Sequence, residues 1–212
     1  YPGTPAEKLV QYQRYPYANI YDVLALPYQD VQQGDWYYSA VSFAYYNGLM
    51  NGVADTLFDP NGTMTRAMLV TVLWRLDGSR APAGRNTFTD VPGGQWYTDA
   101  VTWAAENGVV SGIGGGCFAP NSNVTREQTA VILFNYAHSR GYDVGARADL
   151  SAFPDAGSVS GWAQDALSWA NAAGLINGTV YGGRTILDPQ GSASRAQVAM
   201  ILRSYAEHVV NA

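Results

Sequence analysis

The chain has 212 residues, of which 47% are hydrophobic, so it holds enough apolar material for a folded core. Charged residues make up only 14% of the chain and aromatic residues 13%, a composition that excludes a disordered protein and a coiled coil. The formal net charge of -5 argues against a nucleic-acid-binding protein, because neutralising phosphates requires a dense basic surface.

Membrane insertion and metal chemistry are also disfavoured. No apolar run reaches the ~18 residues of a membrane span, and no secretory pattern opens the chain, so we expect no membrane insertion and no signal peptide within these residues. The single cysteine, Cys117, excludes an internal disulfide and a thiolate metal cluster. We expect it to be a small buried hydrophobic residue, and we predict no cofactor.

The first segment, residues 1–27, matches no other part of the chain and combines several Pro and Tyr residues. We interpret it as an N-terminal extension, either a connection from an upstream region or a strap across the domain.

From residue 28 onward one sequence unit occurs three times, in residues 28–78, 88–141 and 153–208, with a constant offset of 60 between the first two copies. The third copy has one residue inserted before its first Trp and three more before its Pro, where loops tolerate insertions. The connecting segments Asp77–Thr87 and Ser139–Ala152 are rich in Gly, Ala, Arg and Ser and are predicted to be linkers.

Each copy contains two helical patterns. The first is an apolar stripe at positions i, i+4, i+7 and i+8, seen in the first copy at Trp36, Ala40, Phe43 and Ala44. The glycines that end these first helices should adopt the left-handed C′ conformation: Gly48, Gly108 and Gly174. The second helices begin after Thr65, Thr125 and Ser194.

A two-helix unit of about 50 residues cannot bury its apolar faces alone, so the three copies should share one core. The predicted fold is mainly α, with three helix-loop-helix repeats that form a pseudo-threefold, three-pronged bundle within one monomeric chain.

The second helices open on the tetrads 65–68, 125–128 and 194–197, each with Arg in second place. Capping explains the Ser or Thr and the fourth-place Gln128 and Gln197, and Met68 breaks this capping box in the first copy. Capping does not explain the Arg, because a cation in the first helical turn opposes the helix dipole. A guanidinium beside free helix N-terminal amides would form an anion site. We favour this role for the tetrad arginines Arg66, Arg126 and Arg195 over the alternative, an ion pair with a carboxylate of the neighbouring copy.

The combined pattern resembles the S-layer homology domain: aromatic-x-Asp-Val, a Trp followed by spaced Ala residues, Gly-x-x-x-Gly, Phe-x-Pro and a Thr-Arg tetrad, repeated over residues 28–208. The resemblance implies a three-pronged pseudo-trimer on the bacterial surface that binds secondary cell-wall polysaccharide, often pyruvylated, in grooves between prongs. It implies that the tetrad arginines contact the glycan. It also implies close sugar approach at small residues of the turn after the first helix: Gly48, Gly52, Gly108, Gly112, Gly174 and Gly178.

The tetrads depart from the family pattern, because the family's fourth-place Glu is Met68, Gln128 and Gln197 here. Exchanging Glu for Gln removes a repulsion toward an acidic ligand, so a changed glycan preference and a loss of binding both stay open. We expect the three sites to differ in occupancy, with Arg66 weakened by Met68 in its own tetrad.

Two other repeated residue types are candidates. The helical spacing of Trp36, Trp96 and Trp162 favours core or hinge packing, with stacking on sugar faces as the alternative, for which Trp96 and Trp162 are the candidates. The residues that precede the first helices, Asp30, Asp90 and Asp155, are expected to act in turns or caps, with contact to sugar hydroxyl groups as the alternative.

An enzyme is the competing functional class, and the residues and motifs of the sequence argue against it. Neither of the two His recurs between copies, and no Gly-x-Ser-x-Gly, His-Glu-x-x-His or P-loop motif occurs, although a glycosidase-type carboxylate pair stays open. We therefore expect a non-catalytic, extracellular cell-wall anchoring module. Direct binding of peptidoglycan and protein assembly through the Tyr-rich surface are the alternatives.

Overall fold

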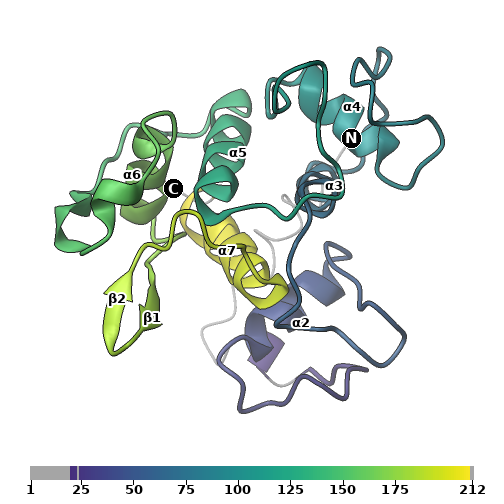
Figure 1. Ribbon diagram of the computed structural model, residues 1–212. Coiled ribbons are helices and arrows are strands. Elements are labelled where there is room, and N and C mark those ends of the chain that lie inside the picture. Colours follow the sequence, from purple (N-terminus) through teal and green to yellow (C-terminus); the bar gives the residue numbers. More distant parts are fainter. Residues whose placement is uncertain (1–19, 23, 211–212) are drawn as a thin grey trace.

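The computed structural model describes residues 20–22 and 24–210 (Figure 1). Its α-helices are α2 (Tyr38–Tyr46), α3 (Arg66–Leu76), α4 (Thr98–Glu106), α5 (Arg126–Ser139), α6 (Gln164–Ala172) and α7 (Arg195–His208). Short 3-10 helices are η1 (Ile20–Asp22), η2 (Leu150–Ala152) and η3 (Ala156–Ser158), and one hairpin joins β1 (Thr179–Tyr181) to β2 (Arg184–Ile186). The predicted mainly helical fold is confirmed, and within the described residues no helix is long and apolar enough to cross a membrane.

The helix ends follow the sequence signals. Thr65, Thr125 and Ser194 each accept a hydrogen bond from the N3 amide, and the capping box closes at Gln128 and Gln197. At the C-terminal ends of the first helices, Gly48, Gly108 and Gly174 have φ of 66°, 68° and 70°. This left-handed conformation is the C′ geometry expected of glycine.

Helices pair between copies rather than within them. The second helix of each copy packs against the first helix of the next, giving the pairs α3 with α4, α5 with α6, and α7 with α2 (Figure 1). The long loop between the two helices of a copy carries the chain from one pair to the next. Each lobe of the molecule is therefore built from two copies.

A closed ring of backbone hydrogen bonds joins the three copies just before their second helices. The N–H of Met64 donates to the carbonyl of Ala193 at 2.9 Å, Ala193 donates to Val124 at 3.0 Å, and Val124 donates back to Met64 at 2.9 Å. All three residues are buried. These three bonds relate the copies in cyclic order, which is compatible with the expected pseudo-threefold bundle.

The expected core role of the first tryptophans is wrong. Trp36, Trp96 and Trp162 are 64%, 58% and 60% exposed, because each lies two residues before its helix begins, in the preceding turn. The aromatic residues that reach the core stand seven positions later: Phe43, Trp103 and Trp169.

The third copy differs from the others in its β1–β2 hairpin. Gly182 and Gly183 turn the chain with φ of 56° and 74°, as a tight hairpin turn requires. The first two copies have only an isolated bridge at this place, so the three inserted residues lengthen a turn that the copies share. At the second-copy bridge, Cys117 is half-buried, which corrects its expected full burial.

Most of the predicted extension, residues 1–19 and 23, lies outside the described residues. The described part contacts α2: the ring of Tyr21 packs against Phe43 at 5.3 Å, and the hydroxyl of Tyr38 donates to the Leu24 carbonyl at 2.7 Å.

Candidate functional site

The first tetrad arginine spans a boundary between copies. Arg66 is the first residue of α3, and its Nε donates to the carbonyl of Phe118 in the second copy at 2.8 Å. The guanidinium lies 4.8 Å from the Phe118 ring centroid, and the residue is only 6% exposed. Burial lowers the pKa of Arg66, opposed by the charge of Asp90. Among the described residues, no group accepts a hydrogen bond from its terminal nitrogens.

The other two tetrad arginines also donate hydrogen bonds to a neighbouring copy. The Nε of Arg126 donates to the Leu187 carbonyl at 2.7 Å, and the Nε of Arg195 donates to the Phe58 carbonyl at 2.7 Å. Arg195 makes one further bond, from Nη2 to the carbonyl of Asn51 at 2.6 Å. The alternative of a strut between copies therefore has a physical basis, but the acceptor is a backbone carbonyl instead of a carboxylate.

The repeated aspartates hold the loops on which these carbonyls lie. The two carboxylate oxygens of Asp90 accept the amides of Phe118 and Ala119 at 2.8 and 2.7 Å. Ala119 has φ of 59°, a strained conformation for a residue other than glycine. Burial raises the pKa of Asp90, but these amides and the charge of Arg66 outweigh it and leave the pKa below its ordinary value.

Asp30 and Asp155 repeat the arrangement, with the amides of Phe58 and Asp59 and of Leu187 and Asp188. The three aspartates lie in turns, as expected, but their carboxylates do not cap a local turn or helix. They bind amides about 30 residues ahead in their own copy, a distance in sequence that a turn motif does not cover.

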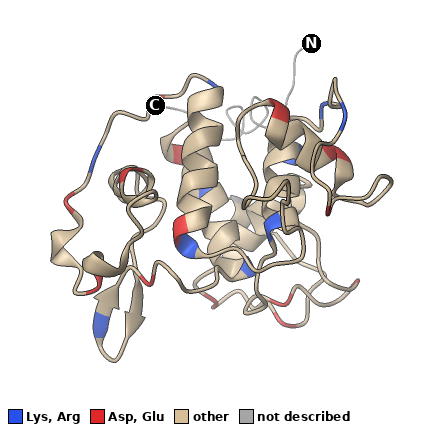
Figure 2. Ribbon diagram, turned by 45° about the horizontal axis from the view of Figure 1, so that its top comes forward, with Lys and Arg blue, Asp and Glu red and all other residues tan. Residues whose placement is uncertain are grey.

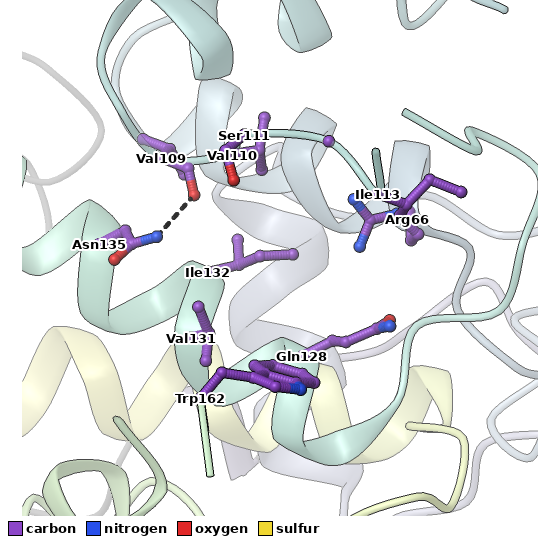
Figure 3. A pocket seen from close by; sticks show the side chains of 11 residues that line it. Arg66, Val109, Val110, Ser111, Ile113, Gln128, Val131, Ile132, Asn135 and Trp162 are labelled. Atoms are coloured by element: carbon purple, nitrogen blue, oxygen red, sulfur yellow. Dashed lines mark hydrogen bonds between the residues drawn. The ribbon is translucent and has the colours of Figure 1, made fainter. Parts of the chain in front are cut away.

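A cavity of about 380 Å³, here called the Arg66 cavity, collects residues from all three copies (Figure 3). Arg66 comes from the first copy, Gly112 and Gln128 from the second, and Trp162 from the third. Val131, Ile132 and Asn135 of α5 form its apolar and amide wall, and the Asn135 side chain donates to the Val109 carbonyl at 3.3 Å. The cavity thus combines a guanidinium, two amides and an exposed indole.

This composition corrects the expectation that one tetrad serves one site. Arg66 shares its cavity with Gln128 of the next copy, and Met68 of its own tetrad is not among the residues that line this cavity. The effect of Met68 on ligand binding by Arg66 stays a prediction. The sequence pattern could not reveal the shared cavity, because the partners of a tetrad depend on which copy packs beside it.

Local geometry already requires several of the predicted ligand-binding glycines. A Cβ on Gly112 would lie 2.5 Å from the Cys117 carbonyl oxygen, and one on Gly52 would lie 2.4 Å from that of Leu57. Gly178 is similarly close to Ile186, at 2.8 Å. These glycines let each loop fold on itself, and their contact with a ligand stays a prediction.

Sequence reasoning did not name seven of the cavity residues as site residues: Val109, Val110, Ser111, Ile113, Val131, Ile132 and Asn135. Asn135 could have been found, because it follows Gln128 by seven residues and so lies on the same helix face two turns later. Basic and acidic residues are scattered over the described ribbon (Figure 2).

Comparison with known proteins supports the reading of the repeats. The model of the S-layer homology domain matches residues 27–67, 87–130 and 152–199. The chain is 33% identical over 162 residues to the Surface-layer 125 kDa protein of Lysinibacillus sphaericus, which covers 76% of the chain and 13% of that protein. It is 30% identical to an amylopullulanase of Thermoanaerobacterium thermosulfurigenes, over 79% of the chain and 9% of that protein.

A third relative is an S-layer protein of Bacillus anthracis, 30% identical over 66% of the chain and 16% of that protein. The chain therefore spans less than a fifth of these relatives, whose names describe surface-layer proteins in two cases and an enzyme in the other. What they share with the chain is the repeated module. The three matched segments show that the chain belongs to the S-layer homology domain family, whose members are non-catalytic anchoring modules of the bacterial cell surface.

Proposed function

We propose that the chain holds a larger exported protein on the cell wall by binding an anionic, pyruvylated secondary cell-wall polysaccharide at the sites of the tetrad arginines. Relatives that are surface-layer proteins and a relative named as an amylopullulanase carry a similar module in different proteins. A module that recurs beside unrelated partners is suited to attachment rather than to one reaction.

The terminal nitrogens of Arg66, which donate to no group in the described part of the chain, carry this proposal. The Nε bond to Phe118 fixes the plane of the guanidinium, so the remaining N–H groups are presented in a set direction. Such a planar pair matches the two oxygens of a carboxylate, the charged group of a pyruvyl ketal. Because no described group accepts a hydrogen bond from these N–H groups, a ligand carboxylate would supply the acceptor.

The rest of the Arg66 cavity suits a sugar ring. Trp162 is 60% exposed and offers a flat apolar face, while Gln128 and Asn135 offer amides to hydroxyl groups. The absence of a carboxylate at the Gln128 position removes a repulsion that an acidic sugar would otherwise meet. By the same correspondence between copies, Gln197 would serve the site of Arg126, and Trp96 would serve the site of Arg195.

The test is a pull-down with purified wall sacculi before and after acid extraction of the secondary polymer. Binding that is lost on extraction supports the polysaccharide. Retained binding would instead assign the module to peptidoglycan, and absence of binding to both would favour protein assembly.

Single substitutions make the test specific to the cavity. Trp162→Ala should melt as the unmodified protein does, because the side chain is mainly exposed, but should bind sacculi about five- to tenfold less tightly. Tyr181→Ala is the matched control, an aromatic residue that is 77% exposed on the hairpin. Equal affinities of these two variants would contradict the role of the Arg66 cavity.

A further inference from the structure

The site of Arg195 differs from the Arg66 cavity in one charged residue. Asn135 lines the Arg66 cavity seven residues after Gln128. The residue at the corresponding place in α3 is Arg75, seven residues after Met68, whereas α7 has Ser204 there. Where the Arg66 cavity has Gln128 and Asn135, the site of Arg195 thus has Met68 and a second arginine, Arg75.

The contacts of Arg75 show that this correspondence holds in space. Its Nη1 donates to the Leu49 carbonyl at 3.0 Å, just as Asn135 donates to the Val109 carbonyl in the second copy. Arg195, from the third copy, donates to the carbonyl of Asn51 at 2.6 Å. The two acceptors are two residues apart on one loop, about 7 Å at most along the chain. Two guanidinium groups from different copies therefore lie along the same short loop.

Within the described part of the chain, no carboxylate pairs with the charge of Arg75. Burial lowers its pKa, and no carboxylate opposes that effect. Arg195 is different, because the charges of Asp59 and Asp30 oppose the effect of burial on its pKa. Among the described residues Arg75 forms no ion pair, and its half-buried guanidinium donates one side-chain hydrogen bond, to the Leu49 carbonyl.

We propose that Arg75 and Arg195 form an anion site distinct in specificity from the Arg66 cavity, one that binds a dianionic phosphate group. The inference rests on the proposed function for the ligand role of Arg195. The role of Arg75 is inferred separately, from its hydrogen bond to the Leu49 carbonyl. Two guanidinium groups can share the oxygens of one phosphate, whereas a single carboxylate satisfies one planar fork. The phosphate could be borne by a wall glycan or be free in solution.

A purely structural role is the alternative for Arg75. A cation in the last turn of α3 interacts favourably with the helix dipole, and its bond to Leu49 ties the helix to the loop. Two reciprocal substitutions separate the roles: Arg75→Asn installs the second-copy residue, and Asn135→Arg places the cation in the Arg66 cavity.

The experiment titrates the full chain and both variants with mannose 6-phosphate and with inorganic phosphate at low ionic strength, by calorimetry and with indole NMR signals as reporters. Arg75→Asn should weaken phosphate binding about tenfold, the scale of one charge-assisted hydrogen bond. Asn135→Arg should add a phosphate site, reported by Trp162, which lines that cavity. Tighter binding of the sugar ester would indicate a glycan phosphate, and equal binding a site for the free anion.

Two results would overturn the proposal: no phosphate binding by the unmodified protein, or unchanged phosphate affinity in Arg75→Asn. A lowered melting temperature together with unchanged affinity would assign Arg75 the structural role. Failure here is distinguishable from failure of the proposed function. If the protein still binds sacculi but the unmodified chain and both variants have the same phosphate affinity, only the phosphate site is refuted. If phosphate binding depends on Arg75 but sacculi are not bound, only the polysaccharide proposal is refuted.

Discussion

Replacing Arg126 with Ala tests whether a tetrad arginine stabilises the fold as well as serving a ligand. Arg126 is buried, and its Nε donates to the Leu187 carbonyl at 2.7 Å across a boundary between copies. An arginine that acted only as an anion ligand would leave the free energy of unfolding unchanged, or raise it on removal, because it opposes the helix dipole. The contact between copies predicts the opposite sign.

The magnitude follows from two opposing effects. A hydrogen bond from a charged donor contributes about 1.5 to 3 kcal/mol, and its loss leaves a carbonyl without this partner. Removing a cation from the first turn of α5 returns about 0.3 to 1 kcal/mol. We therefore expect the free energy of unfolding to fall by about 1 to 2 kcal/mol, or roughly 3 to 6 °C in melting temperature for a domain of this size.

Thermal and urea unfolding of Arg126→Ala measure this change. Arg184→Ala is the matched control, because Arg184 is exposed on the hairpin and forms no side-chain hydrogen bond or ion pair within the described residues. A melting temperature of Arg126→Ala equal to that of the control would refute the strut and leave only the ligand role.

Three other outcomes are expected. Asp90→Asn should lower stability by about 1 to 3 kcal/mol at neutral pH, because the carboxylate binds two amides and holds Ala119 in a strained conformation. Since the pKa of Asp90 is lowered in the folded state, this stabilisation is lost as pH falls through that pKa, so unfolding curves of the variant and the parent should converge in acid. Gly112→Ala should lower the melting temperature, because a Cβ there would lie 2.5 Å from the Cys117 carbonyl oxygen, whereas Gly93→Ala should not, because a Cβ at Gly93 meets no atom within 4 Å; equal melting temperatures would contradict the close approach. Deleting residues 153–212 should abolish cooperative unfolding, measured by circular dichroism, because α6 and α7 cover helices of the other two copies, and a retained sharp transition would show independent copies.

Local structure could be predicted from the sequence because its determinants lie close together in the chain. The caps at Thr125 and Ser194, the capping boxes and the left-handed Gly108 each depend on residues within one helical turn, and all were predicted correctly. Periodicity located the helices for the same reason. It misplaced the exposed tryptophans, since a stripe of apolar spacing does not mark the residue at which a helix begins.

The composition of the sites was decided by the tertiary structure. The sequence indicated which residues recur, among them Arg66, Gln128 and Trp162, but not that these three, each from a different copy, line one cavity. It also did not show that Asp90 holds the loop that receives Arg66. Three nearly equivalent copies offer several self-consistent pairings, and the choice depends on the packing of helices between copies and on the backbone ring that closes them, neither of which leaves a trace in local sequence spacing.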